Sequence, residues 1–115
     1  MLWLPGYPPG WWRSAVAHLL ALALAPAAIA CDPDPDGIAI ALQAARLWED
    51  AGEPWSPWHM DAADLARLPA RRPLTARDRE LLEHLRGLPL PPALAGLAIA
   101  MMETGEKGEQ ESLFW

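Results

Sequence analysis

The stretch Cys31-Asp32-Pro33-Asp34-Pro35-Asp36-Gly37 directly follows the short apolar run Ala27–Ala30 and directly precedes an amphipathic segment. In α/β proteins, metal and phosphate chemistry lies at the carboxyl ends of parallel strands, where such an acidic turn would sit. Each proline disfavours helical geometry for the residue before it, so Asp32 and Asp34 are predicted to be extended. Residues two apart in an extended chain share one face, with Cα atoms roughly 6–7 Å apart. The stretch therefore predicts that Asp32 and Asp34 bind one Mg²⁺ or Mn²⁺ ion.

The same stretch also fits a turn without a ligand. Asp and Pro are common in turns, and Asp36 is a good N-cap for a helix that begins at Gly37. An EF-hand calcium loop is excluded, because position twelve counted from Asp32 holds Gln43, where that loop needs a Glu. A metal site and a capped surface turn are the two interpretations that remain.

Outward from this stretch, hydrophobic periodicity predicts alternating strands and helices. The expected strands are residues 2–4, 27–31 and 57–60, and the expected helices are about 9–24, 37–51, 75–87 and 91–104. The buried positions expected in the first helix are Val16, Leu19, Leu20, Ala23 and Leu24. Residues 105–115 are expected to form a flexible acidic tail. This order predicts an α/β fold with a small parallel sheet flanked by helices.

Length and composition indicate a single globular domain over residues 1–115. Of the 115 residues, 52% are hydrophobic and 21% are charged, and the formal net charge is −6. A protein of this charge repels nucleic acid overall, so contact with DNA must be local. Basic residues form one cluster, which is either a DNA contact or a solvated surface. Its members are Arg67, Arg71, Arg72, Arg77 and Arg79. The single cysteine excludes an internal disulfide and favours a cytoplasmic location.

Residues 11–31 have a second interpretation. One arginine, a long Ala/Leu run and the sequence Ala-Ile-Ala-Cys ending at Cys31 resemble the signal and lipid-attachment box of a bacterial lipoprotein. His18 and Pro26 interrupt the run, which is also too short to span a bilayer, so no membrane segment is expected. A secreted lipoprotein with a lipid at Cys31 is therefore an alternative to the cytoplasmic domain, and the mass of the cellular protein would distinguish the two.

The order of motifs along the chain resembles one known family. The motifs are Gly6-Tyr7-Pro8, residues 32–38, His59-Met60-Asp61, Leu74-Thr75 and Glu109-Gln110-Glu111. Together they resemble the C-terminal Toprim-type domain of the Wadjet defence nuclease subunit JetD and its uncharacterised relatives, which is similar to the Toprim domains of topoisomerase VI A subunits and primases. The resemblance implies DNA cleavage with Mg²⁺ or Mn²⁺ held by Asp32 and Asp34, and Glu109 or Glu111 as a further catalytic acid. It also implies an anti-plasmid defence role with partner subunits of an SMC-like complex.

One acidic residue of that family has no counterpart here. The family places a glutamate near the end of its first strand, whereas this chain has no Asp or Glu before Asp32. Two metal-bound carboxylates polarise a phosphate but do not move protons. We therefore expect a partial Toprim-like domain that lacks the first strand, depends on an upstream segment or a partner subunit, and does not cleave DNA alone. A non-catalytic domain that binds a protein through its tryptophan-rich surface is the alternative.

Overall fold

In a computed structural model of the chain, residues 2–4 and 6–108 are described, and their helices and strands alternate along most of the sequence. The elements are β1 (Leu2–Trp3), α1 (Gly10–Leu22), β2 (Ala27–Ala30), α2 (Pro35–Asp50), β3 (Trp55–Pro57), α3 (Ala62–Arg67), β4 (Arg71–Pro73), α4 (Ala76–Arg86), α5 (Pro92–Thr104) and β5 (Glu106–Gly108).

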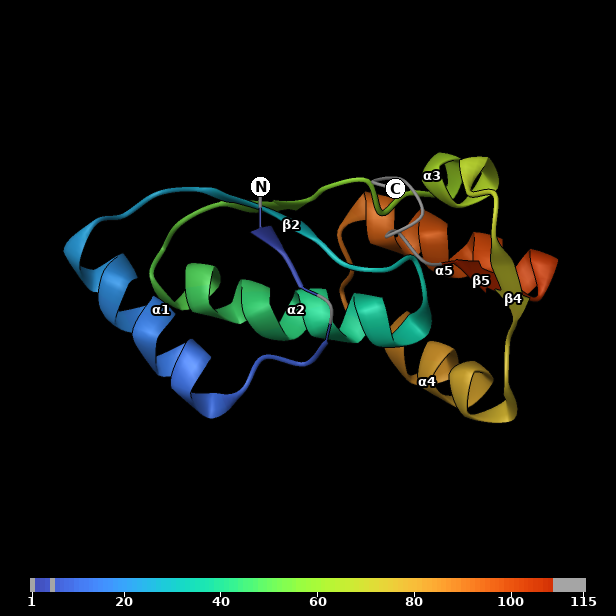
Figure 1. Cartoon of the computed structure of the whole chain (residues 1–115), viewed down its shortest axis with the longest axis horizontal. Coiled ribbons are helices and arrows are strands. Elements are labelled where there is room, and N and C mark those ends of the chain that lie inside the picture. Colours follow the sequence, from blue (N-terminus) through green and yellow to red (C-terminus); the bar gives the residue numbers. More distant parts are fainter. Residues whose placement is uncertain (1, 5, 109–115) are drawn as a thin grey trace.

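The first three strands form a parallel sheet with β2 in its centre. Leu2 of β1 is opposite Ile29 of β2, and Ala28 of β2 is opposite Ser56 of β3. Each strand is followed by a helix before the next strand, and in Figure 1 both α1 and α2 lie below β2. The α/β class and the small parallel sheet flanked by helices are thus confirmed.

The start of α2 differs from its sequence prediction. Asp34 is the N-cap, because its side chain accepts the backbone N–H of Gly37. The assignment of the cap to Asp36 was wrong, since Asp36 lies within the first turn of the helix. The helix ends at Asp50, and Gly52 follows with a φ of 75°, the left-handed conformation that glycine adopts without strain.

The third strand is earlier in the chain than expected. β3 ends at Pro57, whereas the sequence predicted a strand over residues 57–60. The chain leaves the sheet here because His59 adopts a φ of 51°, which no strand residue has. Cys31, directly after β2, donates its backbone N–H to the Sδ atom of Met60 at 3.3 Å, so the segment after β3 still lies against the end of β2.

The second half of the chain contains elements that the sequence did not predict. They are the short helix α3 and an antiparallel pair of strands, β4 and β5, in which Arg72 is opposite Lys107. The expectation of a flexible tail from residue 105 is wrong as far as Gly108, because residues 106–108 form β5. The remaining tail residues, 109–115, lie outside the described part of the chain.

The buried core is built from the sheet, α2, α4 and α5. Its fully buried side chains include Ile29, Ile38, Leu82, Leu94 and Leu97. The helices expected over about 75–87 and 91–104 are confirmed as α4 and α5. α4 begins with a capping box formed by Thr75 and Asp78, and α5 buries Leu94, Leu97, Ala98 and Met101. Within the described residues, no helix has both the length and the apolar character that crossing a membrane requires.

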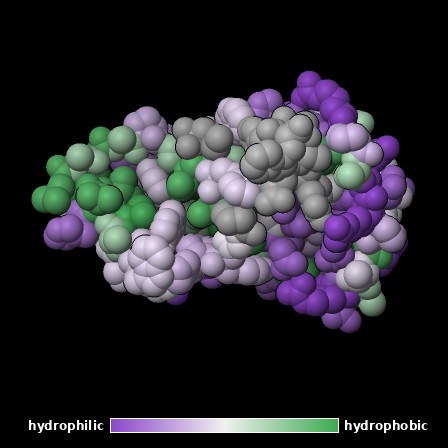
Figure 2. Space-filling model, in the orientation of Figure 1, coloured by the Kyte–Doolittle hydropathy of each residue, from purple (hydrophilic) through white to green (hydrophobic). Residues whose placement is uncertain are grey.

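Helix α1 is much more exposed than its sequence predicted. Leu20 is buried, but Leu19 is 61% exposed. The helix ends at Leu22, two residues earlier than expected, and Ala23 and Leu24 beyond it are exposed as well. The reason is that α1 packs on the core through the single stripe Trp12, Val16 and Leu20, while the apolar residues continue around the helix. Figure 2 shows the result as a hydrophobic (green) end of the molecule, formed by α1 at the left.

Candidate functional site

A polar pocket of about 320 Å³ lies at the carboxyl end of β2, beside the first turn of α2. The residues that line it are Leu4, Gly6, Tyr7, Asp32, Asp34, Asp36, Gly37, Ile40 and Arg77. They come from the segment after β1, the turn after β2, the start of α2 and the first turn of α4. The two predicted metal ligands, Asp32 and Asp34, therefore share a pocket with residues from distant parts of the chain.

The turn that carries the two acids is tighter than the sequence suggested. Asp34 has extended dihedral angles, as expected, but its backbone N–H donates to the carbonyl oxygen of Asp32 at 2.8 Å. This hydrogen bond closes a turn at Pro33, so the two acids are not neighbours on one face of a straight strand. They reach the same pocket because the chain bends between them.

Asp34 is the acid whose charge is most affected by the fold. Burial raises the pKa of its carboxyl group to about 7, and the nearby negative charges of Asp32 and Asp36 raise it further, while the Gly37 N–H and the Lys107 ammonium act in the opposite direction. The carboxyl therefore loses its proton at a higher pH than an ordinary aspartate does. A cation beside it would favour the ionised form, which is the form that binds metals.

Asp36 joins two side chains across the pocket. Its carboxylate accepts two hydrogen bonds from the Arg77 guanidinium, at 3.0 and 3.3 Å, and one from the Tyr7 hydroxyl at 2.9 Å. These contacts hold the pKa of Asp36 below its ordinary value, with Arg77 as the main cause. Burial raises the pKa of Tyr7, and its hydrogen bond to Asp36 raises it further. The hydroxyl therefore stays protonated at neutral pH and donates to Asp36.

Gly37 allows the start of α2 to approach the acidic turn. A Cβ atom at this position would lie 1.8 Å from the carbonyl oxygen of Asp32 and 2.9 Å from Oδ1 of Asp34. No side chain fits at these distances. The pocket therefore depends on glycine here for close backbone contact.

Strand β5 attaches to the other side of the acidic turn. The backbone N–H of Gly108 donates to the carbonyl oxygen of Pro33 at 3.1 Å. The preceding residue, Lys107, forms an ion pair of 2.8 Å with Asp78, which is buried in the first turn of α4. These two contacts fix β5 between the acidic turn and α4.

Glu109 and Glu111, the predicted catalytic acids, lie outside the described residues. Gly108, the residue before Glu109, is the one that is hydrogen-bonded to Pro33, between the two predicted metal ligands. Within residues 2–4 and 6–108, no three His, Cys, Asp or Glu side chains are grouped so as to hold a metal ion. Asp32 and Asp34 are oxygen donors of the type that Mg²⁺ prefers, and two of them suit a weakly held, largely hydrated ion.

The basic cluster is divided by the fold. Arg77 lines the polar pocket, whereas Arg71 and Arg72 are exposed on β4. Arg67, at the end of α3, contacts the buried carboxylate of Asp64. Arg79, also exposed, lies close to Gly105. One predicted DNA-contacting arginine is therefore beside the predicted metal ligands.

Tyr7 is the pocket residue to which sequence reasoning gave no role. It follows β1 as Asp32 follows β2, and the carboxyl ends of adjacent parallel strands meet at one edge of a sheet. That topological rule could have placed Tyr7 beside the acids. Its bond to Asp36 joins residues 29 positions apart and could not be read from local sequence.

Two other chemically notable residues lie at the ends of β2 and β3. Cys31 is fully buried, and burial raises the pKa of its thiol to about 12. His59, with its left-handed backbone, places Nδ1 3.1 Å from the buried carboxylate of Asp64.

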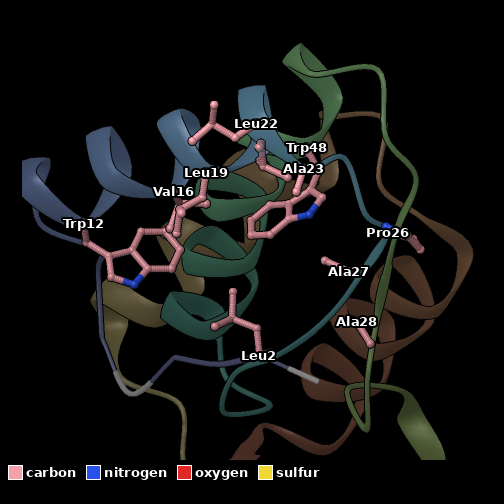
Figure 3. A pocket seen from close by; sticks show the side chains of 11 residues that line it. Leu2, Trp12, Val16, Leu19, Leu22, Ala23, Pro26, Ala27, Ala28 and Trp48 are labelled. Carbon is pink, nitrogen blue, oxygen red and sulfur yellow. The ribbon is translucent and has the colours of Figure 1, made fainter.

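A second pocket, of about 480 Å³, lies at the opposite end of β2 and is apolar (Figure 3). Its walls come from α1, β1, β2 and α2, and they include Leu2, Trp12, Leu19, Ala27 and Trp48. Trp48 is only 8% exposed. Its Nε1 donates a hydrogen bond to the carbonyl oxygen of Ala25 at 3.1 Å. Two of the tryptophans, Trp12 and Trp48, thus line a mainly apolar pocket.

Comparisons with protein families, with curated proteins and with solved structures find no match to this chain.

Proposed function

We propose that the chain is a Toprim-like metal-binding domain of a DNA-cleaving or DNA-processing protein of the anti-plasmid defence type. Mg²⁺ or Mn²⁺ binds at Asp32 and Asp34. DNA is the substrate, and an upstream segment or the partner subunits of an SMC-like complex complete the catalytic site. The observation that carries this proposal is the convergence of two acids and an arginine in one pocket at the carboxyl end of a central parallel strand.

The charge of the pocket supports a cation site. The pocket is lined by three aspartates, Asp32, Asp34 and Asp36, and by one arginine, Arg77. Arg77 forms an ion pair with Asp36. Burial raises the pKa of Asp34, and the negative charges of Asp32 and Asp36 raise it further. A hard divalent cation relieves both costs, because it replaces the lost water around the carboxylates with its own positive charge.

The position of β5 supports a role for the tail acids. Gly108 is bonded to Pro33, so the chain passes the acidic turn immediately before Glu109. Glu109 and Glu111 are proposed as further acidic groups of the site on this basis and on the resemblance. DNA contact is proposed for Arg77 beside the acids and for Arg67, Arg71, Arg72 and Arg79 along the backbone.

Calorimetric titration with Mg²⁺ and Mn²⁺ tests the site. We expect weak binding to the chain and none to the double variant Asp32→Asn with Asp34→Asn. Asp50→Asn, at the far end of α2, is the control for loss of negative charge and should bind like the unmodified chain. Unchanged binding in the double variant would rule out this metal site.

The tail is tested by the double variant Glu109→Gln with Glu111→Gln. If these acids belong to the site, the variant binds Mn²⁺ more weakly than the unmodified chain while its unfolding curve is unchanged. Equal affinity would show that the tail acids have no part in holding the metal.

Activity is tested by plasmid nicking with Mg²⁺ or Mn²⁺. We expect no measurable cleavage, because the proton-transfer group of the family is missing and general acid–base catalysis commonly contributes about 10²–10⁴-fold. Robust nicking that disappears in Asp32→Ala would contradict this expectation.

The apolar pocket favours a second candidate function, a non-catalytic domain that binds a protein. Trp12 and Trp48 line this pocket, and Leu22 on its rim is 73% exposed, as is Trp11 nearby on α1. Exposed apolar groups of this kind mark contact surfaces. The two functions differ in one measurement, since only the first requires that Mg²⁺ or Mn²⁺ binds.

A further inference from the structure

We propose that the apolar pocket at the amino end of β2 binds an uncharged, flat aromatic molecule between the indole rings of Trp12 and Trp48. This pocket is separate from the acidic turn, so the inference requires neither the metal site nor DNA. It gives the pocket a small-molecule ligand, whereas the second candidate function gives it a protein partner. Three features of the pocket support this ligand: the position of its two indoles, the charge of its lining and its depth.

The two tryptophans approach the pocket from different helices. Trp12 belongs to α1 and Trp48 to α2, and in Figure 3 their six-membered rings point toward one another across the hollow. The Nε1 atom of Trp48 donates to the carbonyl oxygen of Ala25, so the polar edge of this indole is held away from the hollow. Ala27 of β2, which also lines the pocket, is too small to fill the space between the rings. Indole rings arranged in this way attract a further aromatic ring by stacking or edge contact.

The lining carries no charge among the residues that the structure describes. Its side chains are aliphatic or aromatic, and their only polar atoms are the two indole nitrogens. A charged ligand would lose its water there without gaining an ion pair, which is costly. The C-terminal end of α1 also borders the pocket, at Ala23, and its last turn contains no basic residue. Because a helix C-terminus carries partial negative charge, an anion is doubly disfavoured, and the pocket selects an uncharged molecule.

The deep part of the pocket is accessible to a small molecule but not to a flat protein surface. Leu20 and Trp48 line it although they are only 6% and 8% exposed, so a ligand has to enter the hollow to reach them. The volume of about 480 Å³ lies within the range of small-ligand sites, which is roughly 300–1,000 Å³. Depth and volume together favour a small molecule over a protein.

The compound 2-naphthol is a suitable probe, because it is flat, aromatic and uncharged at neutral pH. Calorimetry should give a dissociation constant on the order of 10–100 μM, as expected for a ligand with few atoms. Two analogues, 2-naphthoate and trimethyl(2-naphthyl)ammonium, carry a negative and a positive charge on the same rings. We expect each analogue to bind at least about tenfold more weakly than 2-naphthol, because the pocket offers no counter-charge.

Two adjacent tryptophans provide a matched pair of variants. Trp12→Leu removes one aromatic wall and should weaken 2-naphthol binding about three- to tenfold, since one aromatic contact is lost. Trp11→Leu should bind 2-naphthol like the unmodified chain, because Trp11 is 73% exposed and does not line the pocket. If the two variants bind 2-naphthol alike, the ligand does not occupy this pocket.

A second pair of variants tests whether the hollow itself is needed. Ala27→Leu adds side-chain atoms inside the hollow and should abolish measurable binding of 2-naphthol. Ala15→Leu adds the same atoms at an exposed position of α1 outside the lining and should leave binding unchanged. Urea unfolding shows whether each variant is folded, and if Ala27→Leu is not, the tryptophan pair decides.

Three further results would overturn the proposal. Absence of 2-naphthol binding would rule out an aromatic ligand. Equal or tighter binding of either charged analogue would contradict selection for an uncharged molecule. If the chain sediments as a dimer that Ala27→Leu dissociates, a second copy occupies the pocket instead. None of these results depends on Mg²⁺ binding at Asp32 and Asp34, so the proposed function is tested separately.

Discussion

The two ends of strand β2 carry opposite kinds of pocket. At its amino end Ala27 and Ala28 line the apolar pocket, and at its carboxyl end Asp32 lines the polar one. The difference follows from parallel topology: helix α2 begins at the carboxyl edge, where Asp34 caps it by accepting the Gly37 N–H and where the aspartates of the turn gather. At the amino edge, apolar side chains of α1 and the side chain of Trp48 line the pocket. The comparison separates an apolar end, where Trp48 and α1 pack on the sheet, from a polar end, where we propose that the aspartates bind a cation.

Truncating the apolar end should have the largest effect. Trp48→Ala should lower the free energy of unfolding by about 3–5 kcal/mol, because a buried indole and its bond to Ala25 are lost together. Urea unfolding followed by circular dichroism measures it. Trp11→Ala is the control and should stay within about 0.5 kcal/mol, since Trp11 is 73% exposed. A small effect of Trp48→Ala would contradict the role of this end in stability.

The polar end should be most sensitive at its glycine. Gly37→Ala forces a methyl group into the backbone of Asp32 and should cost about 2–3 kcal/mol while it also weakens Mg²⁺ binding. Gly96, inside α5, has no atom within 4 Å of a new Cβ. Gly96→Ala should therefore stabilise the chain by about 0.5–1 kcal/mol. If both variants behaved alike in urea unfolding, the close contact at Gly37 would not exist.

The stability of the polar end should depend on pH through Asp34. Its pKa is about 7 in the folded chain against 3.8 ordinarily, so between these values the folded chain binds a proton that the unfolded chain has released. The corresponding stability is fully present below about pH 4 and is lost as pH rises through 7. Asp34→Asn keeps a capping side chain but cannot ionise.

Relative to the unmodified chain, Asp34→Asn should therefore gain on the order of 1–3 kcal/mol between pH 5 and pH 8. Urea unfolding at both pH values measures the gain, and saturating Mg²⁺ should reduce it by stabilising only the chain that retains Asp34. A difference that did not vary with pH would show that Asp34 titrates normally.

The smallest effect is expected on the rim of the apolar pocket. Leu22→Ser should change the free energy of unfolding by no more than about 0.5 kcal/mol, because Leu22 is 73% exposed. A loss of more than about 1 kcal/mol would mean that α1 is covered by apolar contacts in solution, as self-association would produce, and sedimentation at two concentrations would then identify them.

The elements that sequence reasoning placed well have strong local signals. α5 has a regular 3.6-residue stripe, and α4 begins with a capping box. The buried face predicted for α1 was wrong because this helix packs chiefly on α2, whereas α5 packs on α3, α4 and β5, and this difference in tertiary cover cannot be read from either sequence. α3 was missed because six residues are too few to show a period, and β4, Arg71–Pro73, has no apolar pattern.

The part of the candidate site that sequence reasoning predicted also has a strong local signal. Asp32 and Asp34 follow a short apolar strand, and that local order was enough to locate them at a sheet edge. The choice of N-cap was wrong because Asp34 and Asp36 are both followed by residues that suit the start of a helix. The link from Asp36 to Arg77 joins positions 41 residues apart, and only the packing of α4 beside α2 creates it.

The hydrogen bond between Gly108 and Pro33 has a consequence for synthesis of the chain. About 75 residues separate its two partners in the sequence. At a synthesis rate of about 5–20 residues per second, several seconds therefore pass between synthesis of the acidic turn and synthesis of β5. During that interval β1, α1, β2 and α2 can already form, since all of them precede β5 in the chain. The acidic turn is thus among the last parts of the fold to be completed, and a nascent or interrupted chain would carry its aspartates without the strand that holds them.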